Sequence, residues 1–250
     1  MEIRLIDDEG HGYDVFGMSA TGVRQGLRLT LPFYRHWFRV ESSGSDHVPQ
    51  QGAAILAGNH SGLVPLDAAM VWTDVLERRG RVVRNIADTF VPDLPFISTL
   101  LARVGAVAGC RANVHHLLST GELLMIFPEG TRGIGKPRRE RYRLQTWRVG
   151  HAEMALRHRV PVIPVAIVGA EEQLPLVARL PIHLFGAPFV PFGVPLLLPV
   201  RYHIRYGAPL DLGDASADDP RAVAAAAMRV AAAVESLIGA LLEERKGWFR

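Results

Sequence analysis

The sequence predicts an α/β fold, with a mostly parallel central sheet flanked by helices and an N-terminal amphipathic helical segment in front of it. Two observations carry this prediction. Apolar runs bounded by turn residues recur along the chain, and helix-like stretches separate most of them. The 250 residues are 48% hydrophobic and 21% charged, which suits a protein with a sizeable core. Since no stretch resembles a linker, we expect a tail and helical segment over residues 1–40 and one α/β domain over residues 41–250.

The expected strands are six apolar runs, at residues 53–58, 82–87, 104–109, 123–127, 162–169 and 201–207. Helix-like stretches at residues 66–80 and 146–159 lie between them. Near the end, Asp219 and Pro220 predict the cap and first residue of a long helix. Its apolar stripe is expected to face the core and comprises Val223, Ala227, Val230, Val234, Leu237 and Leu241.

The N-terminal segment from residue 15 to residue 40 contains no acidic residue. Four arginines stand among its apolar and aromatic residues: Arg24, Arg28, Arg35 and Arg39. On one helix they would fall within a sector of about 60°, although Pro32 is expected to break that helix in two. A basic stripe beside aromatic residues suits a membrane interface. The alternative is an ordinary surface helix packed on the domain.

Residues 180–200 form a second unusual segment, with 21 consecutive residues that carry no Asp, Glu, Lys or Arg. Five prolines remove amide donors from it, so it is not expected to form a spanning helix. We interpret it as an apolar loop that covers a lipid tail or dips into the interface, or else as a buried connection.

Charge and cysteine content limit the partners and the compartment. A net charge of +3, with arginines unevenly distributed, indicates anionic partners such as phosphates or acidic lipids. Charge alone leaves nucleic acid open, but no motif favours it and we expect no nucleic-acid partner. The single cysteine, Cys110, excludes an internal disulfide framework and favours a reducing compartment; we expect it to be buried. Residues 1–14 lack the apolar core of a secretory signal.

The first chemical motif is GNHSGLVPLD at residues 58–67, which follows an expected strand and precedes an expected helix that Pro65 would begin. If residues 60–67 were all helical, His60 and Asp67 would lie about 10 Å apart along the axis, so their contact requires a loop. Gly62 permits the bend. A carboxylate on one ring nitrogen stabilises the imidazolium, so the other nitrogen can take a proton. Alternatively, Asp67 only caps its helix and His60 is idle.

The second motif is FPEGTR at residues 127–132, at the end of another expected strand. From residue 132 to residue 148 there are seven cations against one acid, and such a cluster attracts phosphate. The alternative is a solvated basic loop. The stretch GTRGIGK at residues 130–136 has the spacing of a nucleotide-binding loop, but Pro137 replaces the hydroxyl that would bind magnesium. Nucleotide hydrolysis is therefore disfavoured.

Together with VPVIPV at residues 160–165, the two motifs resemble the glycerophosphate and 1-acylglycerol-3-phosphate (lysophospholipid) acyltransferase family. The resemblance covers about residues 33–210, and FPEGTR is its most specific part. It implies a glycerolipid-acyltransferase-like fold. It also implies direct transfer of an acyl group from coenzyme A or acyl carrier protein to a hydroxyl of a lysophospholipid, without cofactor, metal or covalent acyl-enzyme.

The resemblance also implies roles for single residues. His60 would remove the proton of the acceptor hydroxyl while Asp67 orients its ring. The substrate-binding residues would be Glu129 and Gly130, which shape the acceptor pocket, Arg132, which holds the phosphate, and Thr131, Arg111 and Lys136. The sequence departs from the family pattern in one respect: six residues separate His60 from Asp67, where the family has four.

The expected protein is a peripheral enzyme on the cytoplasmic face of a membrane, with membrane lipids as partners. One alternative is a non-catalytic lipid-binding protein that retains the fold. Another is an esterase or thioesterase that transfers acyl groups to water, although no Gly-x-Ser-x-Gly elbow is present.

Overall fold

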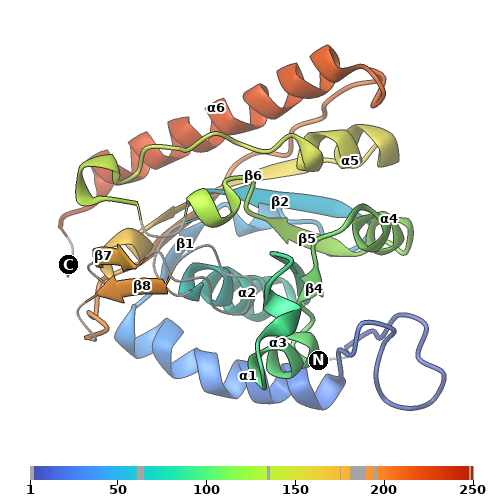
Figure 1. Cartoon of the computed structure of the whole chain (residues 1–250), viewed down its shortest axis with the longest axis horizontal. Coiled ribbons are helices and arrows are strands. Elements are labelled where there is room, and N and C mark those ends of the chain that lie inside the picture. The colour runs from blue at the N-terminus through green and yellow to red at the C-terminus, as the bar shows by residue number, and fades with distance from the viewer. Residues whose placement is uncertain are drawn as a thin grey trace.

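A seven-stranded sheet forms the centre of the protein (Figure 1). The computed structural model describes residues 3–60, 65–133, 136–174, 176–180, 190–193, 196–247 and 249. The strand order is β1-β9-β6-β2-β5-β3-β4. The strands are β1 (Glu41–Ser43), β2 (Ala54–Gly58), β3 (Val83–Ala87), β4 (Val107–Ala108), β5 (Leu123–Ile126), β6 (Val162–Val168) and β9 (His203–Tyr206). Neighbouring strands are parallel except β6 and β9. The predicted, mostly parallel sheet is therefore confirmed.

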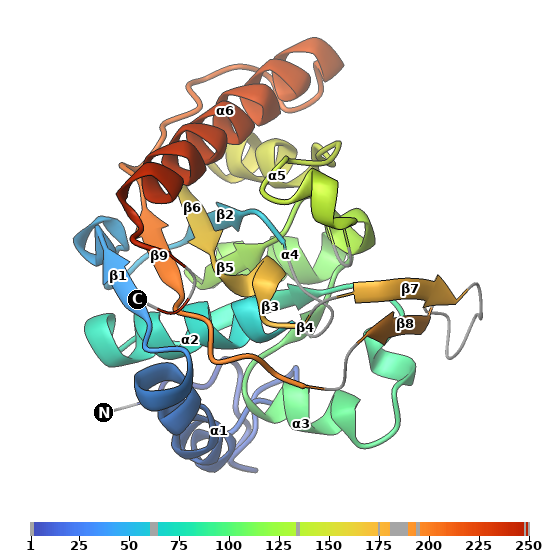
Figure 2. The ribbon, with the colours of Figure 1, turned by 90° about the vertical axis from the view of Figure 1, so that its left-hand side faces the viewer.

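Helices cover both faces of the sheet (Figures 1 and 2). One face carries α1 (Ala20–Pro32), α2 (Leu66–Arg79) and α3 (Ile97–Arg103), and the other carries α4 (Arg111–Ser119), α5 (Gly150–His158) and α6 (Pro220–Glu244). Side chains of a strand alternate between the two faces. Leu56 accordingly joins the core under α1 and α2, while Ile55 and Ala57 join the core under α4 to α6.

The predicted helices differ from the observed ones mainly at their first residues. Pro65 precedes α2 instead of beginning it, and α5 begins at Gly150, four residues later than expected. Asp219 caps α6 by accepting a hydrogen bond from the Arg221 amide, and Pro220 is the first helical residue, as predicted. Among the described residues α6 alone is long and apolar enough to cross a membrane, and its buried residues Val234, Ile238 and Leu241 pack against β6.

The N-terminal segment packs into the protein core. Pro32 does not break the helix, because the chain continues directly into a π-helical turn, η1 (Phe33–Trp37), in which the Phe38 amide bonds to the Phe33 carbonyl. Tyr34 and Phe38 are buried. Arg35 pairs with Glu77, and Arg39 bonds to the Pro199 carbonyl, so only Arg24 and Arg28 remain exposed without a carboxylate partner among the described residues.

Three hydrogen bonds, two of them buried, join this segment to the sheet through Asp74 of α2. Its carboxylate accepts hydrogen bonds from Tyr34 of η1 (2.6 Å), Ser42 of β1 (2.6 Å) and Tyr206 of β9 (2.8 Å). Arg78 adds an ion pair at 3.0 Å. Asp74 thus connects four elements from distant parts of the chain.

A separate pair of antiparallel strands, β7 (Leu176–Leu180) and β8 (Val190–Gly193), occupies part of the segment predicted as an apolar loop. The loop prediction is wrong for residues 190–193. Pro191 is compatible with β8 because a strand of a two-stranded sheet has an outer edge where no amide donor is needed. The rest of the prediction falls partly on residues 181–189 and 194–195, which lie outside the described residues.

Candidate active site

The site lies where β2 and β5 end side by side. These strands are parallel neighbours, with Ala57 paired to Ile126, so the segments that follow them leave the sheet at the same edge. Asn59 fixes the chain as it leaves β2. Its side chain donates a hydrogen bond to the Ile167 carbonyl (2.9 Å) and accepts one from the Ile167 amide (2.8 Å) of β6. These two hydrogen bonds therefore hold the main chain in place just before His60.

His60 and Asp67 are in direct contact, with 2.8 Å between Nδ1 and Oδ2. Asp67 lies in the first turn of α2 and is fully buried, and its Oδ1 accepts a hydrogen bond from the Ala68 amide. The expected contact is confirmed, so the two additional residues between them do not prevent it. Residues 61–64 of the connecting loop lie outside the described residues.

The surroundings of His60 change its affinity for a proton. Burial by itself lowers the pKa of His60, but the charge and hydrogen bond of Asp67, together with the charge of Glu129, raise this pKa above 6.5 overall. The His60 ring stacks on the Phe127 ring, with 4.3 Å between centroids. About a tenth of the side chain is exposed. The ring is thus fixed by contacts on one nitrogen and one face, yet it is accessible.

Glu129 is fully buried and holds the main chain of the site. Its Oε1 accepts a hydrogen bond from the His60 amide (3.1 Å), and its Oε2 accepts one from the Gln145 amide (2.8 Å). Lys136 Nζ lies 2.8 Å from the same Oε2 and 3.3 Å from Glu171 Oε1. The carboxylate therefore ties together the segments after β2 and after β5.

Lys136 was expected to contact substrate, but its side chain is almost fully buried between Glu129 and Glu171. Burial raises the pKa of Glu171, and the charge of Lys136 lowers it in part. The role of Glu171 was not predicted, because the sequence does not reveal that the segment after β6 approaches residue 136.

Gly130, Thr131 and Arg132 form a single 3-10 turn, η4 (Gly130–Arg132), at the surface. Gly130 has φ +54°, and the guanidinium of Arg148 packs against it, 3.2 Å from where a Cβ would lie. Arg132 is exposed, and no described residue bonds to its side chain. Gly133, the next residue, packs against the main chain of His60: a Cβ at Gly133 would lie 2.7 Å from the His60 carbonyl oxygen. The Arg148 guanidinium therefore lies against the turn after β5, and Arg132 is an exposed residue of the same turn.

Arg111 begins α4 and forms an ion pair with Glu153 of α5. It follows β4, which is separated from β2 by β5 and β3. No contact joins it to the other candidate residues in the described part of the chain. Cys110, expected to be buried, is exposed, and its Sγ caps α4 by accepting a hydrogen bond from the Asn113 amide at 3.5 Å.

Comparison with known proteins shows the family of the chain. The acyltransferase family model matches residues 39–168, a region that contains β2, β5 and both motifs. The chain belongs to this acyltransferase family. A protein of Mycobacterium tuberculosis described as uncharacterized is 35% identical over 256 residues, which cover 95% of the acyltransferase and 70% of that relative.

Two further matches differ in what they cover. The human "DGAT1/2-independent enzyme synthesizing storage lipids" is 33% identical over 131 residues, covering 52% of the acyltransferase and 40% of the human protein. The crystal structure of the 1-acyl-sn-glycerophosphate acyltransferase PlsC from Thermotoga maritima has a TM-score of 0.64 at 19% identity. That match covers 90% of the acyltransferase and 81% of PlsC, and it establishes the likeness of fold.

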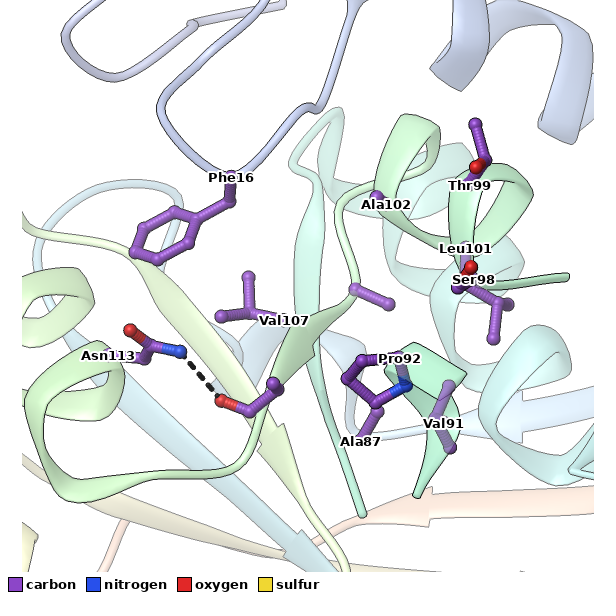
Figure 3. Close-up of a pocket in the computed structure, with 12 residues that line it drawn as sticks. Phe16, Ala87, Val91, Pro92, Ser98, Thr99, Leu101, Ala102, Val107 and Asn113 are labelled. Atoms are coloured by element: carbon purple, nitrogen blue, oxygen red, sulfur yellow. Dashed lines mark hydrogen bonds between the residues drawn. The ribbon is translucent and has the colours of Figure 1, made fainter. Parts of the chain in front are cut away.

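The acyltransferase also has an apolar pocket of about 370 Å³ near this edge of the sheet (Figure 3). Ala87 of β3 and Val107 of β4 line it on the side of the sheet, α3 contributes Leu101 and Ala102, and the N-terminal tail contributes Phe16. Only β5 separates β3 from β2, and neighbouring strands lie about 4.8 Å apart. Two strand spacings, about 10 Å, therefore separate β3, which lines the pocket, from β2, which ends two residues before His60. Among the described residues of the acyltransferase, no three His, Cys, Asp or Glu side chains are grouped to hold a metal ion.

Proposed function

We propose that the protein transfers a fatty acyl group from an acyl thioester, carried by coenzyme A or acyl carrier protein, to a hydroxyl of a lysophospholipid such as 1-acylglycerol-3-phosphate. The contact that carries this proposal is the buried His60–Asp67 pair, in which Nδ1 and Oδ2 lie 2.8 Å apart at the edge where β2 and β5 end. Membership of the acyltransferase family and the PlsC-like fold support the reaction class.

In the proposed reaction, His60 acts as the general base. Asp67 holds the proton on Nδ1, so Nε2 is the nitrogen that accepts the proton of the acceptor hydroxyl. The hydroxyl oxygen attacks the thioester carbonyl carbon, and the carbon–sulfur bond then breaks to give an ester and a thiolate. The thiolate takes the proton from His60, which returns the histidine to its neutral form. No acyl group is attached to the protein at any stage.

The surrounding residues support the binding of both substrates. The Arg148 guanidinium lies beside Gly130, Arg132 is exposed in the same turn, and guanidinium groups bind phosphate by paired hydrogen bonds. The mostly apolar pocket under α3 offers a place for an acyl chain. Glu129, Lys136 and Glu171 keep the main chain of His60 in place. Arg111 is not included, because it pairs with Glu153.

A neutral glycerolipid acceptor is the second candidate. It is favoured by the human relative, whose name describes an enzyme that synthesizes storage lipids. In either case we propose a peripheral protein at the cytoplasmic face of a membrane, since Arg24 and Arg28 are exposed to meet acidic lipids.

The test is thiol release from acyl-coenzyme A and from acyl carrier protein, with lysophosphatidic acid, other lysophospholipids or diacylglycerol as acceptors. We expect release that depends on an acceptor, and His60→Ala should lower it at least a hundredfold. His115→Ala is the matched control, because His115 is exposed on α4 and should leave the rate unchanged. A His60→Ala protein with the wild-type rate would contradict the general base. Release without acceptor would indicate a thioesterase, and lipid binding without release would indicate the non-catalytic alternative.

A further inference from the structure

The outer surface of α3 exposes three large apolar side chains together. Phe96, which precedes the helix, is 91% exposed, and Ile97 and Leu100 are 50% and 54% exposed. Single exposed apolar residues are ordinary, but a contiguous group on one short element marks a binding surface. The rest of α3 faces inward, where Leu101 and Ala102 line the apolar pocket (Figure 3).

The backbone at Phe96 is strained. Its φ of 61° and ψ of −42° lie in a region that bulky residues rarely adopt, and the Ile97 amide bonds to the Pro95 carbonyl across it at 2.6 Å. This is a γ-turn with positive φ, a rare and strained backbone conformation. Because the Phe96 side chain is exposed, packing inside the protein does not compensate for the strain. Such a residue is better explained by a contact that forms outside the protein.

The exposed face of α1 continues this surface. Its helix touches the end of α3 at Gly22, where a Cβ would lie 2.4 Å from the Arg103 carbonyl oxygen. Figures 1 and 2 both show α1 and α3 along one side of the molecule, opposite α6. On α1, Leu29 is 61% exposed, and Arg24 and Arg28 are exposed without a carboxylate partner among the described residues.

We propose that this side is the membrane-binding face, with Phe96, Ile97 and Leu100 inserted among the acyl chains of an acidic lipid monolayer. Arg24 and Arg28 then lie at the level of the phosphates. Charge complementarity favours a lipid surface as the partner. The headgroups of an acidic membrane are anionic and would attract the arginines of α1, and its apolar interior would take up the apolar side chains at the start of α3. The proposal deepens the proposed function, since it brings the pocket under α3 against the layer that would hold a lipid substrate.

The first experiment measures sedimentation with vesicles of phosphatidylcholine and phosphatidylglycerol. Phe96→Gly should lower the partition coefficient about tenfold, because one large side chain no longer inserts. It should not lower the melting temperature, because glycine accepts the positive φ without strain. Met228→Ala is the matched control: Met228 is 72% exposed on α6, on the opposite side, and should partition as wild type. Equal partitioning of Phe96→Gly and wild type would overturn the proposal.

A second experiment locates the contact in a Cys110→Ser protein, which has no other cysteine. An environment-sensitive dye is attached at Phe96→Cys or, as control, at Met228→Cys. Vesicles should shift the emission to the blue only at position 96. A shift that follows protein concentration without vesicles would mean that a second copy covers the surface, and an equal shift at both positions would mean unspecific adsorption; either result overturns the proposal. His60→Ala should bind vesicles as wild type does, so this test is independent of catalysis.

Discussion

At the scale of single residues, the proton affinity of His60 determines the pH range of activity. Burial lowers the pKa of His60, but Asp67 and Glu129 outweigh burial and raise it above 6.5. A general base must be unprotonated, so kcat/KM should fall as the pH drops through a value above 6.5. Asp67→Asn removes the negative charge. The fall should then move to lower pH, and the rate at pH 8 should decrease about a hundredfold.

The measurement is kcat/KM from thiol release between pH 5 and pH 9 for both proteins. If Asp67→Asn left the midpoint of the fall at the same pH, the carboxylate would not be what raises the pKa of His60.

Lys136 allows a second prediction at this scale. It is the cation between two carboxylates, 2.8 Å from Glu129 and 3.3 Å from Glu171, in a buried place. Lys136→Met leaves the carboxylates without that charge, which should lower the free energy of unfolding by about 3 kcal/mol. The other lysine of the chain, Lys246, is exposed, so Lys246→Met is the control and should change little. Urea denaturation measures both; equal stability of the two variants would argue against a structural ion pair.

At the scale of elements, the apolar runs predicted every strand of the central sheet except β1, although the run expected at residues 104–109 is longer than β4. β2, β5 and β6 are apolar runs buried on both faces, so their composition alone distinguishes them. β4 has only two residues, and β1 is short and polar. Their place in the sheet depends on their neighbours. The antiparallel direction of β9 likewise follows from how the chain returns to β6, which local composition does not record.

The candidate site likewise has features that the sequence could predict and features that it could not. The position of His60 beside the FPEGTR turn could be predicted, because residues after parallel strands gather at one edge. The Asn59 bridge to Ile167 and the burial of Lys136 against Glu171 could not, since each joins segments that only the finished sheet brings together.

The junction of α1 and α3 gives an element-scale prediction. Gly22 has no room for a methyl group, with the Arg103 carbonyl oxygen 2.4 Å from a Cβ. Gly22→Ala should therefore push α1 away from α3 and lower stability by about 1–3 kcal/mol. Gly239→Ala is the matched control in α6, where a Cβ meets nothing within 4 Å, and it should stabilise by up to about 1 kcal/mol. Thermal unfolding distinguishes them, and a Gly22→Ala protein as stable as wild type would contradict the close packing.

For the whole molecule, the buried His151 predicts sensitivity to acid. Burial lowers the pKa of His151 to about 4, although its hydrogen bond to the Arg148 carbonyl opposes this. The unfolded chain, with a histidine pKa near 6.5, takes up the proton first as the pH falls. Stability should therefore be lost between pH 6.5 and pH 4, by about 3 kcal/mol from this residue.

Urea denaturation at pH 7, 5 and 4 checks the prediction for His151. His151→Gln cannot take up the proton and should show a smaller loss over the same range. An unchanged pH dependence in that variant would assign the acid sensitivity to other groups.

The pairing of β1 with β9 has a consequence for how the protein folds. The two strands are about 160 residues apart in the chain, and one of the three hydrogen bonds that Asp74 accepts comes from Tyr206 of β9. Contacts between such distant segments form slowly, because a long loop must close first. We therefore expect the β1 edge of the sheet to assemble last. Until it does, the carboxylate that joins the N-terminal segment to α2 lacks one of its donors, and the surface that we assign to the membrane is held less firmly.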